Sequence, residues 1–159
     1  MDAFDDYRSA IAELGEKTGL SLSLEDNHCS FTVDDSVDVN LEFLEESESA
    51  VLWAAVGVLP DDGLAGERAM RLLEMNEPGG ETRGFTLGMD EDGRVLVAHA
   101  RRDVEEGISA NILAAWIEDL VTLVGNVREE FAERYPFIDD EPIPEEPVLI
   151  TDDEKADGR

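Results

Sequence analysis

Apolar and polar residues alternate along three neighbouring stretches in the first third of the chain. In residues 20–26 leucine alternates with serine, and residues 28–35 and 37–43 repeat the pattern with other side chains. Successive side chains of a strand point to opposite faces of a sheet, so this period of two predicts half-buried strands. In residues 37–43 every second position is valine, leucine or phenylalanine, and the positions between them are polar.

The next segment, Ala50 to Leu59, is apolar at almost every position. A strand that is apolar on both faces is covered on both faces. The core of the domain supplies one cover, and a helix or a second subunit would supply the other.

Three segments carry apolar residues at helical spacing. In residues 2–18 four apolar side chains fall on one helical face, and Gly19 favours a stop directly afterwards. A second helix is predicted over residues 64–76. The third, over residues 108–135, has one broad apolar stripe.

Residues 82–89 and 94–102 are predicted to be strands. The order is therefore helix, four strands, helix, two strands, helix. Strands that follow one another in sequence and helices that can pack on them predict an α+β domain, with a twisted antiparallel sheet of about five to six strands.

The composition changes near the end of the chain. We expect one domain over residues 1–137 and an acidic, disordered tail over residues 138–159, where three prolines and nine carboxylates stand beside two basic residues. Residues 147–151, "PVLIT", are an apolar island in this tail. Such an island either has no role or docks on the body as an added strand.

The net charge of −28 changes the range of possible partners. A surface this negative repels phosphate backbones and anionic lipid heads, which excludes nucleic acid and membrane surfaces and favours basic partners. Only two lysines stand against ten arginines. Acid-rich, lysine-poor composition also fits a salt-adapted source, and composition alone does not separate the two explanations.

Cys29 is the only cysteine, so no intramolecular disulfide is possible, which fits a reducing compartment. The acidic N-terminus has no apolar signal-peptide core, and no apolar run is judged long enough to span a bilayer. We therefore expect a soluble cytoplasmic protein.

The best candidate for an ion site is the acidic stretch at residues 90–92, directly before Gly93. An EF-hand loop needs glycine at its sixth position and glutamate at its twelfth. Here glycine is fourth, and Arg94 and Arg101 occupy the fifth and twelfth positions. The spacing rules the motif out and predicts a polar turn between two strands.

The remaining chemistry gives no catalytic site. His28 and Cys29 are adjacent on a predicted strand and point to opposite faces, so they do not engage each other. His99 is the only other histidine. Neither a phosphate-binding glycine motif nor a metal-ligand spacing is present, so we predict no catalytic residue, no metal site and no cofactor.

Several motifs together resemble a known family. The run "VLWAAVGVLPDDG", a short helix leading into "RLLEMNEPGGETRGFTLGMDEDGRVLVAHARR", and a long amphipathic helix are similar to the class I type III secretion chaperones, the Tir-chaperone (CesT-like) family. The resemblance covers roughly residues 1–135 as an order of elements. It implies a cytoplasmic α+β homodimer that holds the N-terminal segment of a secreted effector and delivers it to the secretion ATPase.

The resemblance also implies two sets of site residues. The effector-binding groove would draw on Phe4, Ile11, Leu22, Leu24 and Phe31. The dimer interface would draw on Trp53, Met70, Leu72, Leu73 and Met75. The long acidic tail and the shortage of lysine depart from the family pattern, so a protein-binding relative without a secretion role, as in YbjN-like proteins, is the alternative.

Overall fold

The structure of the protein is a computed structural model, which describes residues 2–20, 22, 24–90, 92, 94–104 and 107–138. The predicted tail from residue 139 onward, with its apolar island at 147–151, lies outside the described residues. The described residues therefore reach residue 138, one position past the end of the expected domain.

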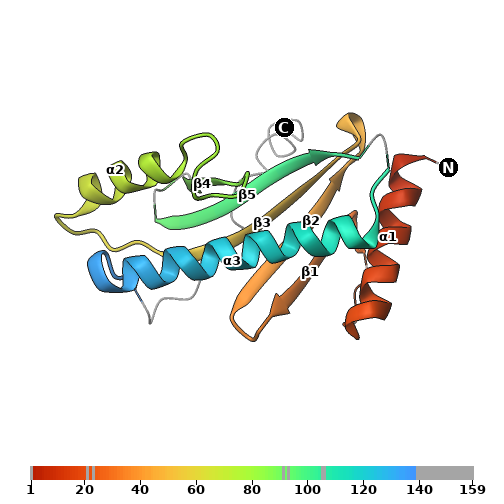
Figure 1. Ribbon diagram of the computed structural model, residues 1–159, viewed down its shortest axis with the longest axis horizontal. Helices are drawn as coiled ribbons and strands as arrows, with labels where there is room; N and C mark the ends of the chain where they lie inside the picture. The colour runs from red at the N-terminus through yellow and green to blue at the C-terminus, as the bar shows by residue number, and fades with distance from the viewer. Residues whose placement is uncertain are drawn as a thin grey trace.

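A five-stranded antiparallel sheet forms the centre of the molecule (Figure 1). Its strands are β1 (His28–Val33), β2 (Val37–Leu44), β3 (Ser49–Val58), β4 (Thr86–Met89) and β5 (Val95–Asp103). Their spatial order is β1-β2-β3-β5-β4, so β1 and β4 are the edges and β3 is central. A short 3-10 turn, η1 (Glu45–Ser47), joins β2 to β3.

Three helices accompany the sheet: α1 (Ala3–Thr18), α2 (Ala65–Met75) and α3 (Ala110–Arg134). Figure 1 shows α3 running along one face of the sheet, with α1 at one end of the molecule and α2 at the other. This arrangement confirms the predicted α+β class, the antiparallel sheet and the three helices.

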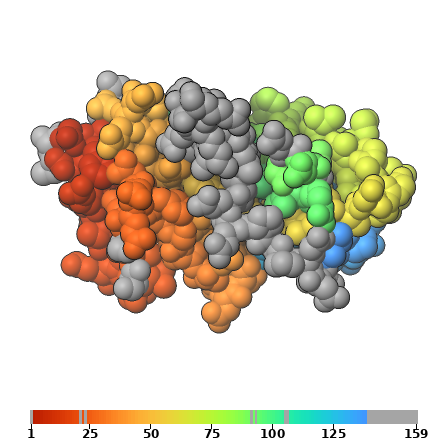
Figure 2. All heavy atoms as spheres, turned by 180° about the vertical axis from the view of Figure 1, so that it is seen from behind, coloured from red at the N-terminus to blue at the C-terminus, as the bar shows by residue number. Residues whose placement is uncertain are grey.

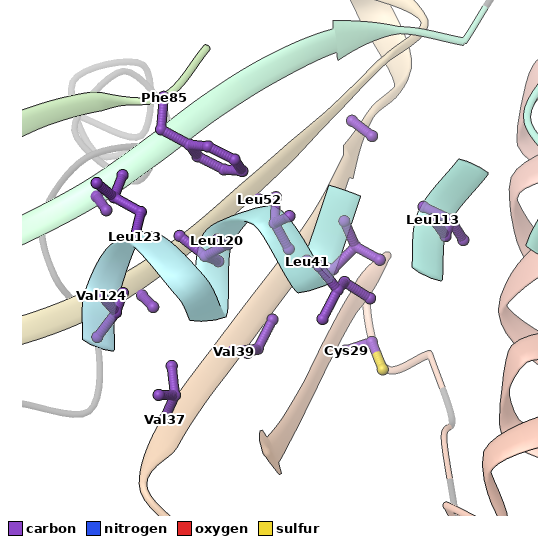
Figure 3. Close-up of a cluster of buried hydrophobic side chains, with 14 of the residues drawn as sticks. Cys29, Val37, Val39, Leu41, Leu52, Phe85, Leu113, Leu120, Leu123 and Val124 are labelled. Carbon is purple, nitrogen blue, oxygen red and sulfur yellow. The ribbon is translucent and has the colours of Figure 1, made fainter. Parts of the chain in front are cut away.

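The main core lies between the sheet and α3. Side chains of β2 and β3, among them Leu41 and Leu52, point toward Leu120 and Val124 of α3 (Figure 3). Cys29 belongs to the same core at 2% exposure, as its phase in the strand predicts. By length and composition α3 is able to cross a membrane, contrary to the expectation from sequence, but eight of its residues are buried and it serves as the core helix of this fold.

The predicted strand at residues 20–26 is wrong for every position that the structure describes there. Leu22 donates its N–H to the carbonyl of Leu20, which turns the chain, and Glu25 makes only an isolated bridge with His28. Leu22 and Leu24 pack half-buried against the core. Alternation therefore reported half-burial correctly, but the segment faces a helix instead of pairing with a strand.

The strand predicted at residues 82–89 begins later than expected. Arg83 and Gly84 both have positive φ, and the N–H of Phe85 bonds back to the carbonyl of Thr82. These residues form turns, so β4 keeps only its last four positions. β4 and β5 pair as the predicted hairpin, and the Asp90 carboxylate accepts the N–H groups of Arg94 and Val95.

Candidate functional site

A groove of about 340 Å³ opens beside α1. Four of the five residues predicted for effector binding line it, together with four that were not predicted. The lining residues are Phe4, Arg8, Ile11, Ala12, Leu22, Leu24, Asp26 and Asn27. The structure therefore brings together, in one hollow, apolar residues from a helix and from the segment that follows it.

One wall of the groove is α1, which is held against β2 by aromatic contacts. The rings of Phe4 and Tyr7 lie 5.2 and 5.3 Å from the ring of Phe43. Asp2 caps the helix by accepting the N–H of Asp5 at 2.8 Å. Burial raises the pKa of the Tyr7 hydroxyl, which stays neutral and acts as part of the core.

The opposite wall is the segment that carries Leu22 and Leu24. It approaches α1 closely at Gly15, where an added Cβ would lie 3.1 Å from the carbonyl oxygen of Leu20. Glycine at this helical position therefore sets how near the two walls lie. Ile11, at 2% exposure, is buried at the base, whereas Phe4, Leu22 and Leu24 remain half-exposed.

Three polar residues complete the lining. The guanidinium of Arg8 lies 4.5 Å from the centre of the Phe4 ring, a cation–π contact. Asp26 and Asn27 both have positive φ and turn the chain into β1. Apolar periodicity does not identify such residues, but Arg8 stands one helical turn after Phe4, and that spacing was available in the sequence.

Phe31, the fifth predicted groove residue, lies on β1 and does not line the hollow. It packs half-buried on the core, beside the edge of the sheet. The main-chain carbonyl of Asn27 accepts the N–H of Phe43, so Asn27 and every second residue after it bond to β2. The main-chain groups of Ser30 and Thr32, which lie between those positions, therefore point away from β2. In the described chain only the bridge to Glu25 occupies this edge, so it can accept an added strand beside the groove.

The other edge of the sheet is closed differently. The side-chain amide of Asn76, directly after α2, donates to the carbonyl of Leu87 and accepts its N–H, both at 2.9 Å. Asn76 thus occupies the outward main-chain groups in the middle of β4. The two edges of the sheet are therefore not equivalent.

The residues predicted for a dimer interface fall into three environments. Leu72 and Met75 are buried in the main core at 5% and 3% exposure. Met70 and Leu73 are 62% and 68% exposed, and they stand three residues apart on the outer side of α2. Trp53 lies on the face of the sheet opposite α3. Of the predicted interface residues on α2, Met70 and Leu73 are the two that are exposed, so an interface on this helix rests on them.

Charged side chains fix the position of α2. The Arg71 guanidinium donates two hydrogen bonds of 2.7 Å to Glu130 of α3 and a further one of 2.8 Å to Glu81. These bonds from Arg71 lower the pKa of the Glu130 carboxyl. Arg68, whose side chain is 3% exposed, makes two bonds to Asp62, and this lowers the pKa of Asp62.

The site thus offers an apolar groove, a free strand edge and an exposed apolar pair on a helix. A family model described as the Tir chaperone protein (CesT) family matches residues 9–128. The chain belongs to this family. The CesT family is one of chaperones and not an enzyme class, and the resemblance noted from sequence is confirmed.

Solved structures share the CesT fold. The HopA1–SchA chaperone–effector complex matches with a TM-score of 0.65 at 17% identity, covering 79% of this chain and 95% of that one. The ExoU–SpcU complex from the type III secretion system of Pseudomonas aeruginosa matches with a TM-score of 0.59 at 19% identity, over 79% and 97%. YbjN from E. coli, described as a putative transcription regulator, matches at 0.56 and 16%, over 79% and 90%. Among curated proteins, no sequence matches significantly.

Proposed function

We propose that this protein is a type III secretion chaperone that binds the N-terminal segment of a secreted effector and keeps it competent for secretion. The observation that carries the proposal is the apolar groove lined by Phe4, Leu22 and Leu24, directly beside the free edge of β1. An extended segment adds to such an edge through main-chain bonds and places apolar side chains in the hollow. Membership in the CesT family and the likeness to chaperones solved with effectors support this proposal.

The chaperone acts as a cytoplasmic homodimer through the outer side of α2. Met70 and Leu73 are large apolar side chains that a monomer leaves in water, and Gly66 precedes them on the same helical side, where a methyl group added to it would meet nothing within 4 Å. Such a side suits close packing against a second copy of the helix. The proposal includes no catalytic step: binding and presentation to the secretion ATPase are the whole activity.

Blocking the groove without touching the core tests the binding proposal. Ala12 lines the groove on an exposed position of α1, so Ala12→Trp fills the hollow. Tagged chain purified from its native cells should retain a secreted protein, identified by mass spectrometry, whose N-terminal segment is protected from protease. Ala12→Trp should lose that protein, and Ala115→Trp, at an exposed alanine of α3, should keep it.

Equal retention by the two variants would refute the groove as the binding site. Capture of a protein that is not secreted would support the alternative, a YbjN-like binding module without a secretion role, whose fold this chain also shares.

The dimer is tested by light scattering. Met70→Glu with Leu73→Glu should convert a dimer into a folded monomer, because two charges cannot be buried unpaired at an interface. Ile112→Glu, at another exposed apolar position, should leave the dimer intact. A double variant that stays dimeric would show that the interface lies elsewhere.

A further inference from the structure

A second apolar cluster lies on the face of the sheet opposite α3, the face seen in Figure 2. It consists of Val51 and Trp53 of β3 and Val95 and Val97 of β5, and none of the four is more than 7% exposed. The buried apolar residues of all three helices belong to the other cluster. The helices therefore cover the face of β3 that is turned toward α3. A segment other than the helices covers the opposite face.

The indole N–H of Trp53 needs a hydrogen-bond acceptor on this face. Trp53 stacks on His28 at 5.6 Å between ring centres, and its indole N–H is buried without an acceptor among the described residues. A buried donor of this kind is costly unless an acceptor approaches it. A main-chain carbonyl of an extended segment is one group that can lie flat on a sheet and supply that acceptor.

The chain itself reaches the rim of the sheet from the α3 side, where Phe137 packs on the main core and stacks on Phe131 at 5.6 Å between ring centres. After α3, the ring of Phe137 packs against Gly57, where any Cβ would clash with it, and the N–H of Ile138 bonds to the carbonyl of Val58 at 2.9 Å. The paired part of β2 ends opposite Ala54, so this end of β3 extends beyond its neighbour. Ile138 thus places the remaining chain at the rim between the two faces.

We propose that the C-terminal segment docks on this outer face of the sheet, with the apolar island at residues 147–151 as its anchor over Trp53. Trp53 lies five positions along the strand from Val58, a distance of about 17 Å. The residues between Ile138 and the island span up to about 33 Å when extended, which is more than enough. Val148 and Ile150 are β-branched residues with the strand propensity that such docking needs.

The charges on the segment and on the outer face leave the apolar island as the part that can dock. Nine carboxylates surround the island in the last 21 residues of the chain. On the outer face Arg101 stands directly opposite Val51, but Glu42 stands opposite Val51 on the other neighbouring strand and Asp103 stands opposite Ser49. The carboxylates of the segment therefore gain nothing from this face, and its apolar residues are what cover the cluster. The segment is therefore an intrachain cover for an apolar sheet face.

Two truncations separate the anchor from the rest of the segment. A chain that ends after Thr151 keeps the island, whereas a chain that ends after Glu146 loses it. In a Trp116→Phe background Trp53 is the only tryptophan and reports on the face. The shorter chain should show red-shifted Trp53 emission and several-fold stronger acrylamide quenching, and the longer chain should match full length.

Identical emission and quenching in the two chains would overturn the proposal. If the shorter chain aggregates, full-length Val148→Asp with Ile150→Asp should expose Trp53 in the same way, and unchanged quenching there would overturn it. A free peptide of residues 139–159 should restore protection to the shorter chain. Protection of the full-length chain that disappears on dilution would instead assign the cover to a second copy and refute the intrachain assignment.

Discussion

The two ends of this molecule hold their proposed binding surfaces in different ways. At the α1 end, the groove is shaped by apolar packing of Phe4 and Tyr7 on Phe43 and by the close approach at Gly15. At the α2 end, the exposed pair on the helix is positioned by ion pairs from Arg71 and Arg68. The groove should therefore respond to changes in core volume, and the α2 surface to pH and salt.

The largest expected effect comes from removing the aromatic support of the groove. Phe43→Ala deletes a ring that is 3% exposed and contacts two rings of α1, so we expect a loss of about 3–5 kcal/mol in unfolding free energy. Urea unfolding measures it. Binding should fall with stability, while oligomeric state persists in the fraction that remains folded. A loss below about 1 kcal/mol would show that α1 is held by other contacts.

A substitution at the α2 end should lower the unfolding free energy by less. Glu130→Gln removes the charge that Arg71 holds across α2 and α3, and we expect a cost of about 1 kcal/mol at neutral pH. Glu133→Gln, an exposed residue one turn further along α3, is the control and should cost less than about 0.5 kcal/mol. Equal losses of unfolding free energy in the two variants would show that the ion pair with Arg71 does not stabilise the fold.

The same pair predicts a direction with pH. Because Arg71 lowers the folded-state pKa of Glu130, the pair stabilises the fold above the carboxyl's unfolded pKa of about 4.3. This contribution is lost as pH falls through the lower folded-state value. Unfolding free energy measured from neutral to acid pH should therefore fall less steeply in Glu130→Gln than in the wild type.

The smallest effect compares two helical glycines. A methyl group added at Gly125 of α3 would meet nothing within 4 Å, so Gly125→Ala should stabilise by up to about 1 kcal/mol through helix propensity. Gly15→Ala should gain less, because its methyl meets the carbonyl of Leu20 at 3.1 Å and pushes the groove walls apart. Thermal unfolding compares the two, and equal gains would mean that the walls yield freely.

Much of the fold follows from periodicity, and its failures have physical causes. Alternation at residues 20–26 predicts a strand that does not form, because alternation reports which side chains are half-buried and not what covers them. The helix at α2 shows the same limit. Its buried stripe is Arg68, Leu72 and Met75, so an arginine occupies a core position and hides the phase of the stripe.

Only the apolar residues of the candidate site could be predicted from the sequence. Phe4, Ile11, Leu22 and Leu24 were identified as groove residues through the family resemblance, and all four line the hollow. Whether Leu72 or its neighbour Leu73 faces outward depends in part on the ion pair of Arg71 with Glu130, which lies on α3 and is distant in sequence. No local pattern contains that information.

The side chain of Asn76 has a consequence for assembly. A sheet with two open edges can add copies of itself at both ends and grow without limit, as fibrils do. Here the amide of Asn76 satisfies the outward groups of Leu87, so β4 is an unfavourable template, while β1 stays open. Pairing of whole sheets is therefore one-sided: two copies that pair through β1 leave only their β4 edges outside, so such growth stops at a pair.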